Sequence, residues 1–391
     1  MLSSFTLPVN ARGRHQLRAG VDFDRVTYSQ DTHRTGYEQF NATGAPLWRT
    51  VFAGPTQLRL SNMEAAWYLM DGWAPLQKVR VEYGVRHDWD RLGGRWELSP
   101  KASVSYGPWS RTRLSASYSV SHDETSLLLF SRPLDQRSIT TFFAQDGAPT
   151  PNTTLGPLYI ANRGQLGNGS YRNLGFGVEQ RLWRSVRLTG NVMRKRGVDG
   201  LTYAGQRGNI FLLQDLKRDV YDSADIAVHQ MLDSRHEWSA TYSRSRTLSN
   251  AVVDINVDQT QIVPNNFGRM GWDVPDRFMS YGYLPTPFQR WSVAYLVETH
   301  EGAPYSINRD GTVIGGVNAQ RFPLFFELDL HVECRVTLLH RRLGVRAGFN
   351  NITNHENPTV VNANIGAADY LKFYGNDGRH FMLRLRALGK E

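Results

Sequence analysis

The residues best suited to chemistry in this 391-residue sequence are aromatic and amide side chains in its long irregular stretches. Aromatic rings stack on apolar or planar ligands, and amides donate and accept hydrogen bonds, so such a set binds a ligand without reacting with it. The alternative is that these side chains stabilise the loops on one another. The candidate ligand contacts are Phe142, Phe143, Tyr159, Asn265, Asn266, Phe267 and Trp272.

Arginines that recur along alternating segments form a second candidate set. A guanidinium pairs with carboxylate or phosphate, so a row of them could favour an anionic ligand. The alternative is that they pair across strands with Glu82, Asp88, Glu327, Asp329 and Glu333. The candidate contacts are Arg80, Arg86 and Arg113, and comparable positions are Arg187, Arg346, Arg384 and Arg386.

Motifs for catalysis and metal binding do not occur in the sequence. The histidines at 229, 236, 331, 340 and 355 lack the spacing of zinc ligands. No Gly-x-Ser-x-Gly elbow, phosphate loop or HExxH motif is present. The single cysteine, Cys334, excludes an internal disulfide framework and a thiolate metal cluster. We therefore expect no enzyme, no metal site and no cofactor.

The elements that position these residues are strands, and the stretch 76–120 shows this most clearly. From 78 to 90, one parity is apolar or aromatic and the other is mostly charged, and the pattern repeats from 113 to 121. Successive side chains of a strand point to opposite faces, whereas a helical period would scatter these residues. The sequence therefore predicts strands with one apolar and one hydrated face.

Strand length separates two kinds of β-protein. Strands of soluble domains usually have about five or six residues, whereas a membrane-spanning strand needs roughly nine to eleven. The alternation over 78–90 is longer than either, and its apolar face ends in Tyr83, His87 and Trp89, as an interfacial aromatic girdle would. These features favour a barrel with an apolar exterior and a polar lumen.

Composition is compatible with this prediction. Hydrophobic residues make up 40% of the chain, mean hydropathy is -0.44, and no apolar run is long enough for a transmembrane helix. A transmembrane barrel escapes that criterion because lumen-facing and loop residues dilute its signal. The net charge of +9 is spread without a Lys/Arg run, so we expect no nucleic-acid partner.

The alternation predicts about fourteen strands, joined by short turns on one side and long loops on the other. The longest predicted loop is 122–170, a further loop is predicted at 197–218, and 74–76 is predicted to be a tight turn. The predicted strands are 15–28, 57–73, 78–90, 97–106, 113–121, 172–183, 186–196, 220–231, 236–246, 277–284, 290–300, 324–338, 343–350 and 378–387.

Several segments resemble TonB-dependent outer-membrane receptors, in particular the Oar-like subgroup. Residues 68–73 and 81–88 are similar to the family's "QDxW … GxRxD" region, with Met70 where the family often has Gln. Ser99-Pro100-Lys101 resembles its "SPR" strand start, and segments 321–329, 350–358 and 378–387 resemble its final hairpins and closing strand. The resemblance covers roughly residues 15–387.

This resemblance implies a barrel in the outer membrane of a Gram-negative-type bacterium that imports an unidentified nutrient such as a siderophore, glycan or peptide. Its partners would be outer-membrane lipid and the barrel-assembly machinery. Family barrels have about twenty-two strands and an amino-terminal plug that engages the TonB system. Neither the plug nor about eight of the strands is found here, so we expect residues 1–391 to be a single domain, the carboxy-terminal part of such a barrel.

The chain ends also depart from the family. Residues 1–20 contain no basic segment followed by an apolar core, so no secretory signal peptide is predicted, and residues 389–391 lack a terminal aromatic. We interpret the chain as a fragment. Two other functions stay open: a self-standing porin-like channel of about fourteen strands, and a secreted β-sandwich that binds glycans as an adhesin.

Overall fold

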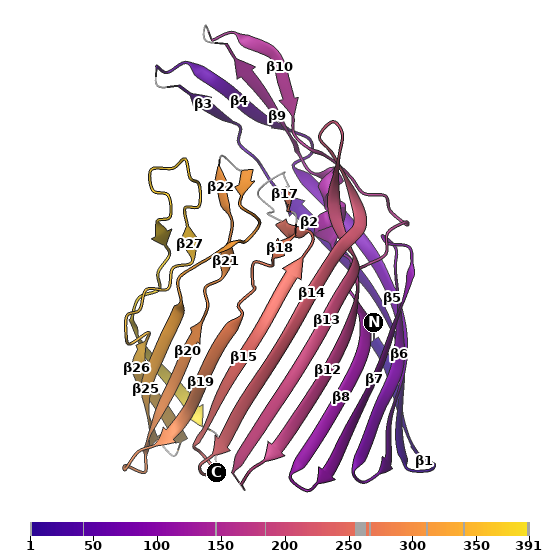
Figure 1. Ribbon diagram of the computed structural model, residues 1–391, viewed down its shortest axis with the longest axis vertical. Helices are drawn as coiled ribbons and strands as arrows, with labels where there is room; N and C mark the ends of the chain where they lie inside the picture. Colours follow the sequence, from indigo (N-terminus) through magenta and orange to yellow (C-terminus); the bar gives the residue numbers. More distant parts are fainter. Residues whose placement is uncertain are drawn as a thin grey trace.

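The main element of the protein is one large antiparallel sheet. The structure is a computed structural model that describes residues 2–41, 43–144, 147–183, 185–254, 263–265, 267–309, 312–338 and 341–388. Its largest sheet has 17 strands, of which fifteen are nine residues or longer and pair in chain order (Figure 1). The predicted all-β, up-and-down architecture is confirmed, and all fourteen predicted strands occur.

The long strands have the following bounds. They are β1 (Leu2–Asn10), β2 (Arg14–Asp31), β5 (Gln57–Leu76), β6 (Val79–Asp90), β7 (Trp96–Trp109), β8 (Thr112–His122), β12 (Ser170–Arg181), β13 (Val186–Gln206), β14 (Ile210–Met231), β15 (Glu237–Ser249), β19 (Asp276–Pro285), β20 (Trp291–His300), β25 (Phe325–Leu338), β26 (Arg341–Asn350) and β29 (His380–Leu388).

Shorter elements lie in the connections between them. They are β3 (Tyr37–Phe40), β4 (Pro46–Ala53), α1 (Leu127–Ser131), η1 (Arg132–Leu134), β9 (Arg137–Phe143), β10 (Pro149–Leu155), β11 (Leu158–Ile160), β16 (Val252–Asp254), β17 (Val263–Asn265), β18 (Gly268–Arg269), β21 (Pro304–Tyr305), β22 (Ile307–Arg309), β23 (Thr312–Ile314), β24 (Gln320–Arg321), β27 (Val360–Val361) and β28 (Phe373–Tyr374).

The two faces of the sheet differ in polarity. On β5, Leu58 and Leu60 point to the inner face and are 8% and 4% exposed, while Trp67 and Leu69 point outward and are 40% and 52% exposed. The same exposed parity continues around the sheet as an apolar band, which lipid would cover. Members of this band are Phe5, Val21, Tyr83, Val104, Leu114, Phe176, Val192, Ile226, Phe278, Val332, Leu383 and Leu385.

Connections between the long strands are short at one end of the sheet and mostly long at the other, where β6–β7 and β13–β14 are the short exceptions (Figure 1). β5 and β6 are joined by two residues, as are β7 and β8, whereas residues 32–56 and 123–169 separate β2 from β5 and β8 from β12. The predicted asymmetry is therefore confirmed. Among the described residues, no helix is long and apolar enough to cross a membrane.

Three sequence predictions were wrong in detail. β1 was not predicted, and most of the predicted loop 197–218 belongs to β13 and β14. Register shifts between Gly197 and Thr202 interrupt the alternation there, and Asp199 has a φ of 58°. The predicted turn at 74–76 is part of β5, where a register shift after Trp73 accommodates Pro75, which has no amide to donate.

The sheet curves as a barrel wall but is not closed. Among the described residues, β1 pairs with β2 alone and β29 pairs with β26 alone, so each leaves one edge without a neighbouring strand. Because the long strands form one curved sheet and not two stacked sheets, the β-sandwich alternative is wrong for the part of the chain that the structure describes.

A hydrophobic core lies at the long-loop end, on the inner face. α1 packs there against β5, and the core joins Leu60, Leu129, Phe130, Tyr203 and Leu213. The hydroxyl of Tyr203 donates to the carbonyl of Leu129 at 2.7 Å, which satisfies this buried polar group. The core anchors the long connection 123–169 to the wall.

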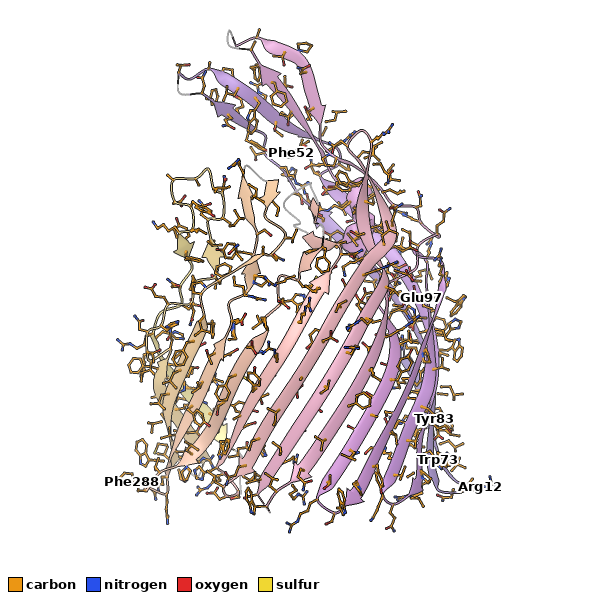
Figure 2. The ribbon with its side chains drawn as sticks, in the orientation of Figure 1. Arg12, Phe52, Trp73, Tyr83, Glu97 and Phe288 are labelled. Atoms are coloured by element: carbon orange, nitrogen blue, oxygen red, sulfur yellow. The ribbon has the colours of Figure 1, made fainter. Side chains whose placement is uncertain are left out.

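One carboxylate on the outward parity interrupts the apolar band near the short-turn end. Asp71 is 5% exposed, and its side chain accepts from Tyr83 Oη at 2.9 Å and from the backbone amide of Gln16 at 3.2 Å. His15 Nδ1 lies 2.6 Å from Asp71 Oδ2, and the His15 ring stacks on Trp73. Figure 2 places Trp73 and Tyr83 toward the short-turn end.

Replacing this carboxylate should destabilise the wall. Asp71→Ala removes the carboxylate that His15, the Gln16 amide and Tyr83 contact. We therefore expect the free energy of unfolding, measured in detergent micelles, to fall by about 2–3 kcal/mol. Asp71→Asn keeps an acceptor oxygen and should cost clearly less. Equal stability of the alanine variant and the parent in a urea titration would contradict this account.

Candidate functional site

The predicted aromatic contacts do not form one site. Phe142 and Phe143 lie on β9 in a separate four-stranded sheet, β10-β9-β4-β3, above the barrel wall (Figure 1). Phe142 is 39% exposed, and the guanidinium of Arg49 lies 5.9 Å from the centroid of the Phe143 ring. These two rings stay candidates for ligand contact.

Tyr159 has a different environment. It is 6% exposed, and its ring centroid lies 4.8 Å from that of Tyr203 and 5.6 Å from that of Phe211. Its side chain is thus part of the core beneath the loops and cannot reach a ligand without rearrangement of that core.

The third group of predicted contacts lies near β18. Phe267 and Trp272 are 64% and 61% exposed, and the Trp272 ring lies 6.3 Å from the ring of Tyr221. The backbone of Asn265 belongs to β17, and Asn266 lies outside the described residues. Phe267 and Trp272 remain candidates for ligand contact.

The three predicted arginines lie on the inner wall and already have polar partners. Arg80 donates to Glu82 at 2.7 Å, Arg86 donates to Asp88 at 2.7 Å, and Arg113 donates to Ser105 Oγ at 2.7 Å. The two hydrogen-bonded carboxylate pairs are within one strand, two residues apart, and not across strands as the alternative predicted, although Arg86 also lies 3.8 Å from Asp22 on β2. Cross-strand pairing does occur elsewhere, between Arg386 and Glu333 at 2.6 Å.

Of the predicted contacts, Arg86 alone lines a cavity of 450 Å³ at the upper inner wall. Eight carboxylate residues and one arginine face this cavity, together with His122 and Asn168. Low-dielectric walls focus the negative potential of such a set, so the cavity attracts cations and repels anions. The carboxylate residues are Asp22, Asp24, Glu64, Asp88, Asp90, Glu97, Asp123 and Glu124.

Part of this cavity is held rigid by an amide. The side-chain nitrogen of Asn168 donates to Asp90 at 3.3 Å and to Glu97 at 3.3 Å, and the Asn168 backbone amide donates to Glu97 at 2.5 Å. Asp90 also accepts from the Gly93 amide at 2.8 Å. Sequence analysis missed this arrangement, although the inward parity of β6 already carried Asp88 and Asp90. Among the described residues, no group of three or more candidate metal ligands is assembled.

Buried ion pairs connect two long loops above the cavity. Asp135 accepts from Arg34 at 2.8 Å and from Arg132 at 2.9 Å, and these three side chains are between 3% and 6% exposed. Arg34 belongs to the β2–β5 connection and Asp135 to the β8–β12 connection. The pairs therefore hold the base of the four-stranded upper sheet.

A shared hydroxyl sits where the β8–β12 connection meets the wall. Tyr171 Oη lies 3.0 Å from Asp123 and 2.8 Å from Asp219, but it has one proton to donate. Burial raises the pKa of Asp123, while Tyr171 and the nearby lysines partly oppose that rise. Protonated Asp123 would supply the second donor that this contact lacks.

No family model and no curated protein matches the sequence. Solved structures do match. The outer membrane transporter YddB from Escherichia coli aligns at 13% identity with a TM-score of 0.67, over 98% of this chain and 54% of that one. The siderophore receptor PirA from Acinetobacter baumannii aligns at 11% identity with a TM-score of 0.66, over 98% and 53% of the two chains.

A third alignment has the same extent. The ferric enterobactin receptor PfeA from Pseudomonas aeruginosa, in complex with enterobactin, aligns at 13% identity with a TM-score of 0.66, over 98% of this chain and 53% of that one. The fold is that of an outer-membrane receptor barrel. This receptor-type barrel spans about half the length of the solved chains that it resembles. The resemblance found in the sequence is confirmed at the level of the fold.

Breaking the buried ion pairs should release the upper sheet of the receptor-type barrel. Asp135→Asn leaves two buried guanidinium groups without their carboxylate, so we expect the amides that pair β4 with β9 to exchange about a hundredfold faster, equivalent to ~3 kcal/mol. Glu38→Gln, which breaks an exposed pair with Arg49, should change exchange little. Unchanged exchange in the Asp135 variant would show that β4 and β9 hold together without the ion pairs.

The contact at Asp123 should weaken as pH rises. Its folded-state pKa lies above the ordinary value of 3.8, so the folded protein holds this proton more tightly than the unfolded chain. Stability is therefore highest below the ordinary value and falls as pH rises through the raised pKa. We expect protease cleavage within 123–169 to become faster from pH 4 to pH 7, and Asp123→Asn to remove that dependence. A parent whose cleavage rate, corrected for the pH dependence of the protease, stays constant would contradict the shift.

Proposed function

We propose that this chain is the barrel part of an outer-membrane transporter that imports an unidentified nutrient, such as a siderophore, glycan or peptide. The observation that carries the proposal is the curved sheet with an apolar outer face, a polar inner face and its long loops at one end. A pore-forming wall in lipid needs this distribution of polarity. The protein would accordingly reside in the outer membrane of a Gram-negative-type bacterium.

The domain organisation follows from the same proposal. Residues 1–391 would form one domain, with the plug and the remaining wall strands supplied by chain outside this sequence. The solved receptors that align with it are nearly twice as long, which supports this arrangement. Coupling to the TonB system would then act through the plug, and insertion through the barrel-assembly machinery.

A self-standing porin-like channel is the second candidate function. Its support is the predominantly polar inner wall, where β7, β8 and β12 present Ser105, Ser117 and Gly175 to the lumen. The two unpaired sheet edges count against it, because an exposed edge in lipid leaves backbone amides and carbonyls without partners.

The cargo would meet two kinds of surface on its way inward. The exposed rings of Phe142, Phe267 and Trp272 lie on the loops, and the carboxylate-lined cavity lies on the wall below. Transport does not require chemistry at either place, which agrees with a protein that is a transporter and not an enzyme. An anionic cargo would have to avoid the carboxylate cavity or be carried through it in a neutral or cationic form.

Paired substitutions on adjacent residues of β5 test whether the wall lies in lipid. Leu69→Arg places a charge on the outward face near the middle of the strand and should reduce outer-membrane integration, because a lipid-facing arginine costs about 2–4 kcal/mol there. Met70→Arg, one residue away on the inner face, should integrate normally.

The readout is heat-modifiable migration of membrane fractions on a gel, which reports a folded barrel. Equal migration shifts for both variants would contradict a lipid-facing exterior. A soluble, folded parent chain that never reaches the membrane fraction would overturn the proposed function.

A further inference from the structure

Positive charge is concentrated on one part of the outward face. Continuing the outward rows across the sheet, Leu174 lies opposite Arg194, which lies opposite Asp222, which lies opposite Arg246. In adjoining rows, Arg172 lies opposite Arg196, and Arg244 lies between Ala224 and Asp276. We call this set, on β12, β13, β14, β15 and β19, the outer arginine patch.

The patch contains more positive than negative charge. Its five arginines are Arg172, Arg194, Arg196, Arg244 and Arg246, and its two carboxylates are Asp222 and Asp276. Asp222 accepts from both Arg194 at 3.1 Å and Arg196 at 2.9 Å, and Asp276 lies 3.6 Å from Arg244. A surplus of three positive charges therefore remains.

The arrangement also juxtaposes like charges. Arg172 and Arg196 occupy directly opposite positions on β12 and β13, which is destabilising unless an anion lies between them. Arg194 and Arg244 are 64% and 72% exposed, so their donors are accessible from outside. Arginine binds phosphate with two parallel hydrogen bonds, and this makes phosphate the best-matched anion.

The height of the patch is set by strand geometry. Arg194 and Arg196 lie eight and ten positions above Val186, the first residue of β13 at the short-turn end. At a rise of about 3.4 Å per residue and a tilt of about 40°, this corresponds to roughly 20–25 Å, the height of the apolar band of a membrane barrel. The patch therefore lies at the upper boundary of the band, where lipid headgroups begin.

An apolar trough leads into the patch from below. It has a volume of 800 Å³ and runs between the side chains of Val104, Leu114, Phe176, Val178, Ile226 and Tyr242. Its floor is low because the outward positions include Gly190 and Ala224, which are opposite Val178 and Val192 on adjacent strands. A second groove of 560 Å³ shares Phe176, Val192 and Ala224 with the trough and is bordered by Arg194 and Arg246.

We propose that the trough and the outer arginine patch together bind one phosphorylated membrane lipid, with an acyl chain in the trough and its phosphate against Arg194, Arg196 and Arg246. The trough is apolar, as a hydrocarbon chain is, and the patch supplies the positive charge that complements a phosphate headgroup. This proposal rests on the proposed function, because it requires the outward face to lie in a membrane. The site is on the opposite face of the wall from the carboxylate cavity, so it serves lipid and not cargo.

Native mass spectrometry of the full chain in neutral detergent micelles tests the site with dioleoyl phosphatidic acid as probe and dioleoylglycerol as the uncharged counterpart. We expect the phosphorylated lipid to remain bound and Arg194→Gln/Arg246→Gln to weaken its binding about tenfold, because charge-assisted hydrogen bonds are lost. The matched control is Arg163→Gln/Arg207→Gln, which removes two exposed loop arginines and should bind as the parent does.

A second variant tests the trough. Ala224→Trp places a large side chain in the floor of the trough. We expect it to weaken the binding of dioleoyl phosphatidic acid and to leave the binding of inorganic phosphate unchanged. Equal binding of both diacyl lipids, or no effect of the Arg194/Arg246 change, would overturn the proposal. Competition by inorganic phosphate at the same concentration as the lipid would reassign the patch to free phosphate and also overturn it.

Failure of this proposal and failure of the proposed function give different results. A chain that enters micelles and shows heat-modifiable migration but does not discriminate the lipids refutes the lipid site alone. A chain that folds in water and does not enter micelles refutes the membrane barrel, and the lipid site with it.

Discussion

Inter-strand backbone hydrogen bonding is the constraint on which the rest of this structure depends. A strand within hydrocarbon has no water to satisfy its amides and carbonyls, so each must pair with its neighbours along the whole span. The ladders meet this demand on both sides of the thirteen long strands between β1 and β29, among the residues that the structure describes, and on one side of those two edge strands. Once the register is set, side-chain parity follows, and with it the assignment of each strand residue to the outward or the inward face.

Parity assignment places two groups of charges on opposite faces of the wall, a carboxylate cluster inside and an arginine-rich patch outside. Carboxylates converge on the inner wall of β2, β5, β6 and β7, where water can reach them, and the Asn168 amide holds two of them. The arginines of the outer arginine patch lie on the outward face of β12–β15. The lone outward carboxylate near the short-turn end, Asp71, is surrounded by donors. Under the proposed function, these outward charges lie toward the two ends of the membrane span.

Much of the fold could be predicted from the sequence because period-two alternation is a local signal. The segments at 78–90 and 324–338 show it without interruption, and both are strands. The extensions of β13 and β14 could not be predicted, since the bulges near Gly200 shift the parity within a strand.

The candidate site was harder to predict than the fold. Tyr159 looked like a loop ring, but its burial depends on Tyr203 and Phe211, which follow it by more than forty residues. The outer arginine patch required the register of five strands, which one sequence does not contain.

The upper four-stranded sheet has a consequence for the order of assembly. β4 and β9 pair Trp48 with Phe142, although 94 residues separate them, and β5 to β8 lie between them in the chain. Closing so long a loop is entropically costly before the intervening hairpins have formed, so this pairing should be among the slowest contacts to appear. The amides that pair β4 with β9 should therefore become protected from hydrogen exchange only after the wall beneath them has formed.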